Sequence, residues 1–173
     1  MQFVILNDEQ KEEYSNQILE MLTAGDNDFV PPLSARSSTT QTNLTGVKGS
    51  LDGVVSYFNE MMKQKIICSV SKGKVLGFVS FKENYVTDAF DKTPNIYLST
   101  LILRPEARGK NLTFNIYDYL FNVVYSNSSV YTRTWSTNAP HVKILSKFNF
   151  AEILRKKNDR GEGIDTVYYA LVR

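Results

Sequence analysis

The sequence predicts a mixed α/β (α+β) domain, and three observations support this fold class. A length of 173 residues with 42% hydrophobic content suits one globular domain that spans residues 1–173. The stretch from Ile96 to Leu120 changes from an apolar, β-branched run into a helical pattern, which indicates a buried strand that leads into a helix. Strand-like and helix-like segments follow one another along the whole chain in the order β-α-α-β-β-β-α-β-α-β-β.

A short strand, Phe3 to Leu6, and a long helix are expected at the start of the chain. Asn7 or Asp8 can cap this helix, and the acidic residues of its first turn suit the positive end of the helix dipole. Gly25 is expected to end it. Its buried stripe consists of apolar residues four positions apart, which are Tyr14, Ile18 and Leu22.

Residues 26–49 are the least regular part of the sequence. The hydroxyl-rich second half is typical of a linker, whereas Phe29, Leu33 and Arg36 would let the segment fold over a site as a lid. Loops of this length are usually either functional or mobile. Both a flexible linker and a substrate lid are therefore compatible with the sequence.

A second helix is expected from Ser50, which can cap it. Its apolar side would consist of Leu51, Val54, Val55, Phe58 and Met62. Two strands follow at residues 65–71 and 75–83, and the short link with a glycine between them predicts an antiparallel hairpin. Residues 84–95 form a second irregular loop before the central strand.

The C-terminal third continues the alternation after the central strand and its helix, expected over residues 112–126. Residues 129–137 predict a strand, with Tyr131, Arg133 and Trp135 on one side. Asn138-Ala-Pro then opens a helix with an apolar face, because Asn is a good N-cap and Pro fits a first turn. A final hairpin joins residues 151–155 to 166–172, and its charged turn is interpreted as a solvated loop.

Composition narrows the classes of function. A net charge of +2 is too mild for a dedicated nucleic-acid-binding protein, so no nucleic-acid partner is expected. The single cysteine, Cys68, excludes an internal disulfide and lies in an apolar run, which favours buried strand packing over a nucleophile. No apolar run approaches the roughly 20 residues that span a bilayer, and the N-terminus lacks the features of a secretion signal. A soluble, cytoplasmic protein with no membrane partner is expected.

The turn after the central strand is suited to phosphate. Arg108, Gly109 and Lys110 separate the apolar run from the helix that follows. The N-terminus of a helix offers amide N–H groups and a partial positive charge, and the two cations add full charges. An ordinary strand, turn and helix would give the same pattern, so this device alone does not decide the function.

Two motifs resemble the GNAT superfamily of N-acetyltransferases. Leu103-x-Pro105-x-x-Arg108-Gly109-Lys110 is similar to the acetyl-CoA signature of that family, although Asn111 and Thr113 replace its second and third small residues. Residues 137–150 resemble the second landmark of the family, and the order of elements matches over most of the chain. The resemblance implies one mixed, mainly antiparallel central sheet flanked by about four helices.

The resemblance also implies acetyl-CoA as cosubstrate and no metal. The backbone of the central strand would pair with pantetheine, the turn would hold the pyrophosphate, and Asn138 would reach the pantetheine arm. The implied binding residues are Leu101, Ile102, Leu103, Arg108, Gly109, Lys110, Asn111, Leu112, Thr113 and Asn138.

Catalytic residues are harder to assign. In the family an acceptor amine attacks the thioester directly, and many relatives use a tyrosine acid where this chain has Leu145. Ser146, Tyr117, Tyr119 or a water could protonate the thiolate instead. Glu83 and Asp88 are expected to border the acceptor cleft and to bind a cationic amine or accept its proton. His141 is more suited to packing or capping than to acting as a base.

The resemblance leads to one main hypothesis and one alternative from another class. The main hypothesis is an acetyl-CoA-dependent N-acetyltransferase, as a monomer or homodimer, for a small molecule, an amino acid or a peptide amine. The alternative is a catalytically weak or inactive module that binds CoA as a structural or sensory ligand. The departures at Asn111, Thr113 and Leu145 favour the alternative, whereas Arg108, Gly109, Lys110 and Asn138 favour the enzyme.

Overall fold

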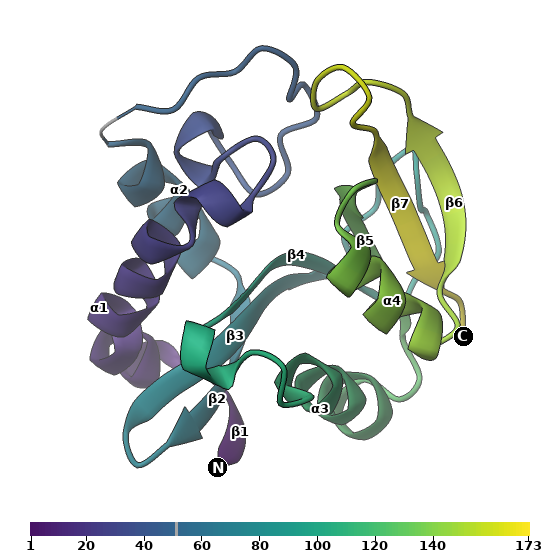
Figure 1. Ribbon diagram of the computed structural model, residues 1–173. Helices are drawn as coiled ribbons and strands as arrows, with labels where there is room; N and C mark the ends of the chain where they lie inside the picture. Colours follow the sequence, from purple (N-terminus) through teal and green to yellow (C-terminus); the bar gives the residue numbers. More distant parts are fainter. Residues whose placement is uncertain (51) are drawn as a thin grey trace.

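The sheet has one parallel pair of strands at its centre and antiparallel pairs on both sides of it (Figure 1). The computed structural model describes residues 1–50 and 52–173. Its strands are β1 (Gln2–Ile5), β2 (Lys65–Ser71), β3 (Lys74–Glu83), β4 (Asn95–Leu103), β5 (Ser129–Trp135), β6 (Ala151–Lys156) and β7 (Thr166–Leu171). They lie in the order β1-β2-β3-β4-β5-β7-β6, with β4 and β5 parallel. The predicted mixed, mainly antiparallel sheet is confirmed.

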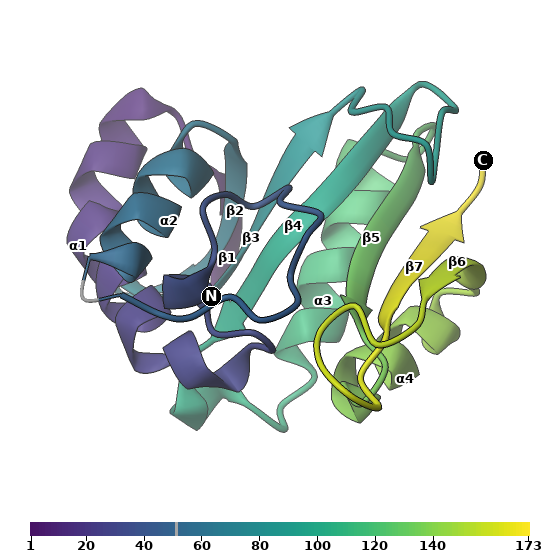
Figure 2. The ribbon, with the colours of Figure 1, turned by 90° about the horizontal axis from the view of Figure 1, so that it is seen from above.

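Helices cover both faces of this sheet. They are α1 (Asp8–Ala24), α2 (Gly53–Met62), α3 (Leu112–Asp118) and α4 (Ala139–Lys147). Successive side chains of a strand point to opposite faces, so Ile66 and Cys68 of β2 pack with α1 and α2, whereas Ile67 packs with α3 and α4. Figure 2 shows α1 and α2 beside β1–β3 and α3 behind β4 and β5. Cys68 is fully buried, as predicted, and burial raises the pKa of its thiol to about 12.

The first helix forms as the sequence predicts. Asn7 caps it in a reciprocal pair with Gln10, in which each backbone N–H donates to the other side chain, at 2.9 and 3.1 Å. Ile18 and Leu22 are fully buried on its inner face. Gly25 follows its last residue and donates its N–H to the carbonyl of Met21.

The start of the second helix differs from the prediction. It begins at Gly53 with Asp52 as the N-cap, so Ser50 does not cap it. Its inner face carries Tyr57 and Met61, and Val55 is 45% exposed instead of buried. Helical spacing from Tyr57 explains the difference, because Val55 lies two positions away and therefore points elsewhere. Leu51, predicted on the apolar side, lies outside the described residues.

The central strand, its turn and its helix follow the predicted pattern. Leu112, Ile116 and Leu120 are all buried against the sheet. The helical segment is not α-helical throughout, because α3 continues as a π-helix, η4 (Tyr119–Val124). A short 3₁₀ helix, η3 (Pro105–Ala107), lies between β4 and the turn that leads into α3.

Residues 26–50 are folded against the rest of the chain. The segment contains the 3₁₀ helices η1 (Asp26–Asp28) and η2 (Leu33–Ala35), and Leu33 and Leu44 are buried. It meets the loop between β6 and β7, where the Thr45 hydroxyl donates to the carbonyl of Asp159 at 3.0 Å. Figure 1 shows the two segments meeting above the sheet, and Figure 2 shows them side by side in front of it. A free linker does not make such contacts, so a covering role fits this segment better.

None of the helices in the described residues combines the length and the apolar character needed to cross a membrane.

Gly53 allows residues 26–50, called the covering segment below, to approach α2 closely. A Cβ atom at Gly53 would lie 1.9 Å from the carbonyl oxygen of Ser34, well inside van der Waals contact. We expect Gly53→Ala to lower the free energy of unfolding by about 1–3 kcal/mol through overpacking. Helix propensity alone would predict a gain of about 1 kcal/mol. Urea unfolding measures the difference.

Ser56→Ala is the matched control for this prediction. Ser56 is exposed on the same helix, so its replacement is expected to change the free energy of unfolding by less than about 0.5 kcal/mol. A Gly53→Ala protein at least as stable as the wild type would contradict the close approach of Ser34.

Candidate functional site

The two parallel strands separate soon after they begin to pair. β4 and β5 are in register from Asn95 opposite Ser129 to Leu98 opposite Thr132. Beyond Leu98, β4 continues beside β3 to Leu103, but its other side has no strand neighbour. Figure 2 shows the two strands diverging. An unpaired strand edge presents backbone N–H and C=O groups, so residues 99–103 offer a ready partner to an extended ligand.

A bulge in β4 lies at the point of separation. Ser80 of β3 pairs with Thr100 and Phe81 pairs with Leu98, so Ser99 is an extra residue on β4. The Ser99 hydroxyl lies 2.8 Å from that of Ser80 and donates to Gln64 Oε1 at 2.6 Å. On the other side, the Thr132 hydroxyl donates to the carbonyl of Leu98 at 3.0 Å. Bulges bend and twist a strand, which turns β4 away from β5.

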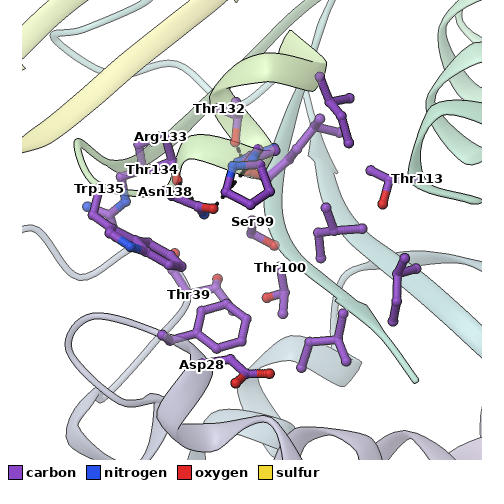
Figure 3. Close-up of a pocket in the computed structure, with 18 of the residues that line it drawn as sticks. Asp28, Thr39, Ser99, Thr100, Thr113, Thr132, Arg133, Thr134, Trp135 and Asn138 are labelled. Carbon is purple, nitrogen blue, oxygen red and sulfur yellow. Dashed lines mark hydrogen bonds between the residues drawn. The ribbon is translucent and has the colours of Figure 1, made fainter. Parts of the chain in front are cut away.

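A cavity of about 350 Å³ fills the space between the separated strands (Figure 3). Its walls come from residues 98–103 of β4, residues 132–135 of β5, α3, α4, the covering segment 26–50 and the β6–β7 loop. Figure 3 shows Thr113 on the opposite side of the cavity from Trp135, Thr39 and Asp28. The cavity therefore reaches from the α3 side of the sheet to the covering segment.

The turn before α3 has the backbone conformation of an anion-binding loop. Gly109 and Asn111 both have positive φ, +71° and +58°. Gly109 needs no Cβ there, and Asn tolerates the left-handed conformation better than most residues. A side chain at Gly109 would meet no atom of the chain within 4 Å, so the space outside the turn is open. Alternating conformations of this kind turn successive N–H groups toward one point, which suits phosphate.

Arg108 lies at the mouth of the cavity and already has an acidic partner. Its Nη2 atom is 2.7 Å from Oδ2 of Asp28 in the covering segment. Both side chains are about half exposed, and an exposed ion pair contributes at most about 1 kcal/mol. A phosphate that approaches the turn can therefore replace Asp28 at little cost.

The predicted cofactor residues divide into two groups. Those that line the cavity are Leu101, Ile102, Leu103, Arg108, Thr113 and Asn138. Those that form the adjoining turn, outside the lining, are Gly109, Lys110, Asn111 and Leu112. Asn138 is also the N-cap of α4, as predicted, because its Oδ1 accepts from the His141 N–H. Its Nδ2 donates to the Thr134 hydroxyl at 3.0 Å, which ties α4 to β5.

A tyrosine and the single histidine meet in the cavity wall between α3 and α4. The Tyr117 hydroxyl lies 2.9 Å from Nε2 of His141. Burial raises the pKa of Tyr117 and lowers the pKa of His141 to about 4. Both side chains are therefore neutral at pH 7, and the hydrogen bond joins a phenol to an uncharged imidazole.

Solved structures resemble this arrangement over nearly the whole chain. No family model and no curated protein matches the sequence. An N-acetyltransferase from Staphylococcus aureus Mu50 matches with a TM-score of 0.66 and 19% identity over 99% of both chains. YncA from Salmonella typhimurium, solved with its cofactor acetyl-CoA, matches with a TM-score of 0.66 and 14% identity over 99% of this chain and 93% of YncA.

A third structure, a GNAT-family protein from Desulfovibrio desulfuricans, has a TM-score of 0.65 and 10% identity over 99% of this chain and 98% of its own. The chain has the GNAT fold. The resemblance that the two motifs predicted is thus confirmed for the fold. At identities of 10–19%, the similarity establishes the fold and does not identify the acceptor.

The three predicted catalytic residues lie outside the cavity of this GNAT fold. Glu83 is exposed at the end of β3, where Lys65 and the hydroxyl of Tyr125 donate to its carboxylate, and these bonds lower its pKa. Asp88 is exposed in the 84–95 loop beside a second cavity of about 240 Å³. Ser146 is exposed on α4 and donates its hydroxyl to the Val142 carbonyl at 3.0 Å.

The sequence indicates Arg108 as a binding residue and Arg36 as part of a lid, but it assigns no role in the site to Arg133 or Arg160. Arg36, Arg133 and Arg160 all line the cavity, together with Phe29 and Trp135. The alternation of side chains along β5 predicts that Arg133 and Trp135 lie on the same face, and this is the only sequence pattern that indicates their common location. The interpretation of residues 156–163 as a solvated loop is wrong for Arg160, which is 7% exposed. Its loop folds back over β5, so that the guanidinium lies 5.7 Å from the centre of the Trp135 ring.

The protonation state of His141 can be tested directly, because the chain has one histidine. Its pKa of about 4 lies below the value near 6.5 of an unfolded chain. The unfolded state then binds more protons between these values, so stability falls as the pH is lowered from 6.5 toward 4. We expect the imidazole NMR signals of the folded protein to show no titration between pH 5.5 and pH 8.

The urea-unfolded protein serves as the control, with an expected midpoint near pH 6.5. A folded-state midpoint near 6.5 would mean that the imidazole is solvated and free to act as a base at neutral pH.

Proposed function

We propose that this protein is an acetyl-CoA-dependent N-acetyltransferase in which an acceptor amine attacks the thioester directly. The observation that carries the proposal is the continuity of one cavity with the unpaired edge of β4 and with the left-handed turn at Gly109 and Asn111. The unpaired strand edge suits the amides of an extended pantetheine arm, and the turn suits a pyrophosphate at the other end of the same groove. YncA, which shares the fold, holds acetyl-CoA.

The pantetheine arm and the pyrophosphate of acetyl-CoA have suitable partners in the cavity and in the turn beside it. The pantetheine amides pair with the free backbone groups of residues 101–103, and Asn138 faces the same space from the start of α4. The pyrophosphate lies on the turn, where the first amides of α3 have no intrahelical partner. Arg108 leaves Asp28 for the phosphate, and Lys110, which is exposed, adds a second charge.

The reaction needs a neutral amine, a polarised carbonyl and a proton donor for the departing thiolate. The amine nitrogen forms a bond to the carbonyl carbon and loses a proton to water, while a backbone N–H of β4 stabilises the negative carbonyl oxygen. The carbon–sulfur bond then breaks. Tyr117 donates its proton to the departing thiolate and regains one from the water that took the proton of the amine, while His141 holds the tyrosine hydroxyl in place, so the role that Leu145 cannot fill passes to α3. Leu145 is fully buried in the core.

A CoA-binding module without catalysis remains the second candidate. Within the described part of the chain, the one carboxylate that lines the cavity is Asp28, which is paired with Arg108. The cavity thus offers no free carboxylate as a base, and this observation favours the second candidate. Turnover decides between the two.

Binding of CoA tests the phosphate turn. We expect Gly109→Asp to weaken CoA binding at least tenfold in calorimetry, because a carboxylate would meet the pyrophosphate and the left-handed position would be strained. Gly73→Asp is the matched control. Gly73 also has a positive φ, +74°, and open space around it, but it lies in the β2–β3 turn outside the cavity. Equal losses in both variants would remove the turn from the proposed site.

Turnover tests the proposed proton donor. A panel of primary amines with acetyl-CoA is expected to give thiol release with the wild type. Tyr117→Phe is expected to lower kcat about tenfold, at the low end for acid catalysis because a thiolate is a stable leaving group. The same change strands the His141 ring nitrogen, so thermal unfolding must be measured alongside.

Tyr119→Phe is the control, because Tyr119 is the next tyrosine along and packs on Phe3 outside the cavity. Its kcat is expected to stay within twofold of the wild type. Saturable CoA binding with no thiol release from any amine would overturn the enzyme and leave the binding module.

A further inference from the structure

Three arginines from distant parts of the chain meet at one end of the cavity. Arg36 comes from the covering segment, Arg133 from β5 and Arg160 from the β6–β7 loop. Arg36 and Arg160 are 8% and 7% exposed, and Arg133 is half-buried. Arginine is rarely this buried unless an acidic group accompanies it.

The three guanidinium groups have no acidic partner in residues 1–50 and 52–173, since none of them forms an ion pair there. Backbone carbonyls hold them instead. Arg36 donates twice to Pro31, at 3.1 and 2.8 Å, Arg160 donates to Val30 at 2.6 Å, and Arg133 donates to Thr39 at 3.4 Å. Carbonyl groups orient a cation but do not neutralise it, so the positive charge of this end remains.

The acidic groups nearby are engaged elsewhere. Asp26 accepts hydrogen bonds from the backbone N–H and the hydroxyl of Ser34. Asp28 pairs with Arg108 at the mouth of the cavity. Asp159, the neighbour of Arg160 in sequence, forms no direct ion pair with it: the Thr166 hydroxyl lies between them, donating to Asp159 at 2.6 Å and accepting from Nε of Arg160 at 2.9 Å.

The electrostatic cost of this arrangement is visible in the pKa values of Arg36 and Arg160, whereas the pKa of Arg133 is raised, because the effect of its burial is outweighed by the nearby Tyr97 and Tyr168. Burial, and then the charges of Arg36 and Arg133, lower the pKa of Arg160 to about 9. Burial also lowers the pKa of Arg36. Three like charges in a region poor in water destabilise one another, and an anion placed among them would offset that cost.

Donor groups of the cluster remain open toward the cavity. Nη1 of Arg36 and Nη2 of Arg160 make no hydrogen bond with another described residue. In the described part of the chain, the buried side-chain atoms that lack a partner are Ser69 Oγ and Thr87 Oγ1. Nη1 of Arg36 and Nη2 of Arg160 are absent from that set, so these two nitrogens are accessible to a ligand in the cavity.

Two of these guanidinium groups lie over aromatic rings. The guanidinium of Arg36 lies 5.4 Å from the centre of the Phe29 ring, and that of Arg160 lies 5.7 Å from the centre of the Trp135 ring. Phe29 and Trp135 are 5.9 Å apart and form an apolar wall. These contacts restrict where the two guanidinium groups can lie. A guanidinium carries paired N–H donors that suit bidentate contact with a carboxylate or a phosphate.

We propose that the acceptor is an amine that carries an anionic group, a carboxylate or a phosphate, which Arg36, Arg133 and Arg160 bind. This inference rests on the proposed function, because it places the acceptor at the end of the cavity opposite Tyr117 and the phosphate turn. The amine then points toward the open edge of β4, and the carbon skeleton lies against Phe29 and Trp135. An anionic acceptor also needs no carboxylate in the cavity to hold it.

Matched pairs of amines test the charge requirement with the wild-type protein. The pairs are β-alanine with propylamine, L-phenylalanine with phenethylamine, and O-phosphoethanolamine with ethanolamine. Within at least one pair, the anionic member is expected to have a kcat/KM at least tenfold higher, as charge-assisted hydrogen bonds imply. A preference in the phosphate pair alone identifies a phosphate ligand, and one in the carboxylate pairs alone identifies a carboxylate. Neutral amines that react as well as their anionic partners would overturn the proposal.

A variant that lacks one of the three positive charges tests whether these arginines bind the anionic group of the acceptor. Arg133 has the weakest backbone bond of the three, so Arg133→Gln disturbs the fold least. We expect it to raise KM for the preferred anionic amine about tenfold and to leave CoA binding and the neutral partner unchanged. Arg155→Gln is the control, because Arg155 is exposed on β6 and outside the cavity. Equal effects of Arg133→Gln on both members of a pair would contradict a role in binding the anion.

Calorimetry on the CoA-saturated protein separates this proposal from the transferase. If the anionic amines bind and their neutral partners do not, and the assay with acetyl-CoA gives no thiol release, the anion site is upheld and catalysis is overturned. Acetylation of neutral amines, with no binding of any anionic one, upholds the transferase and overturns the anion site. Absence of binding by every anionic amine overturns the anion site whatever the turnover.

Discussion

The structure depends on the point at which β4 and β5 stop pairing. Up to Leu98 the strands are neighbours, and beyond it β4 must leave one side of its backbone open. The extra residue at Ser99 bends the strand, and the Thr132 hydroxyl supplies the Leu98 carbonyl with a partner where β5 departs. An open backbone edge inside a protein is costly unless water or a ligand pairs with it. This single constraint both creates the cavity and gives it a polar wall.

The two ends of the cavity have different chemistry because different elements build them. The α3 side offers a left-handed turn, the exposed cations Arg108 and Lys110, and the neutral pair of Tyr117 and His141. The other side is built by the covering segment and the β6–β7 loop, which join through Thr45 and through the bond from Arg160 to Val30. Those contacts hold arginines in place through carbonyl groups, so they fix the shape of the cavity while they keep its charge.

The motif residues of the site were predictable because their roles are local. The conformation of the turn follows from Gly109 and Asn111 themselves, and the cap of α4 follows from Asn138. The expected acceptor carboxylates, Glu83 and Asp88, do not line the cavity, and the reason is the opposite one. Glu83 lies at a strand end, and its direction is set by Lys65 and Tyr125, which come from other elements. Sequence spacing carries no information about such partners.

The sequence by itself determined the order of the elements, the capped ends of α1 and α4, the hairpins and the turn before α3, because hydrophobic period and backbone preference act over a few residues. Tertiary structure alone decided where β4 leaves β5 and which charged residues became buried. Nothing in the local sequence predicts that Arg36 and Arg160 are buried and Arg133 half-buried, and each of them donates to a carbonyl of the covering segment in the folded chain. Burial of a charge depends on partners that only the folded chain brings together.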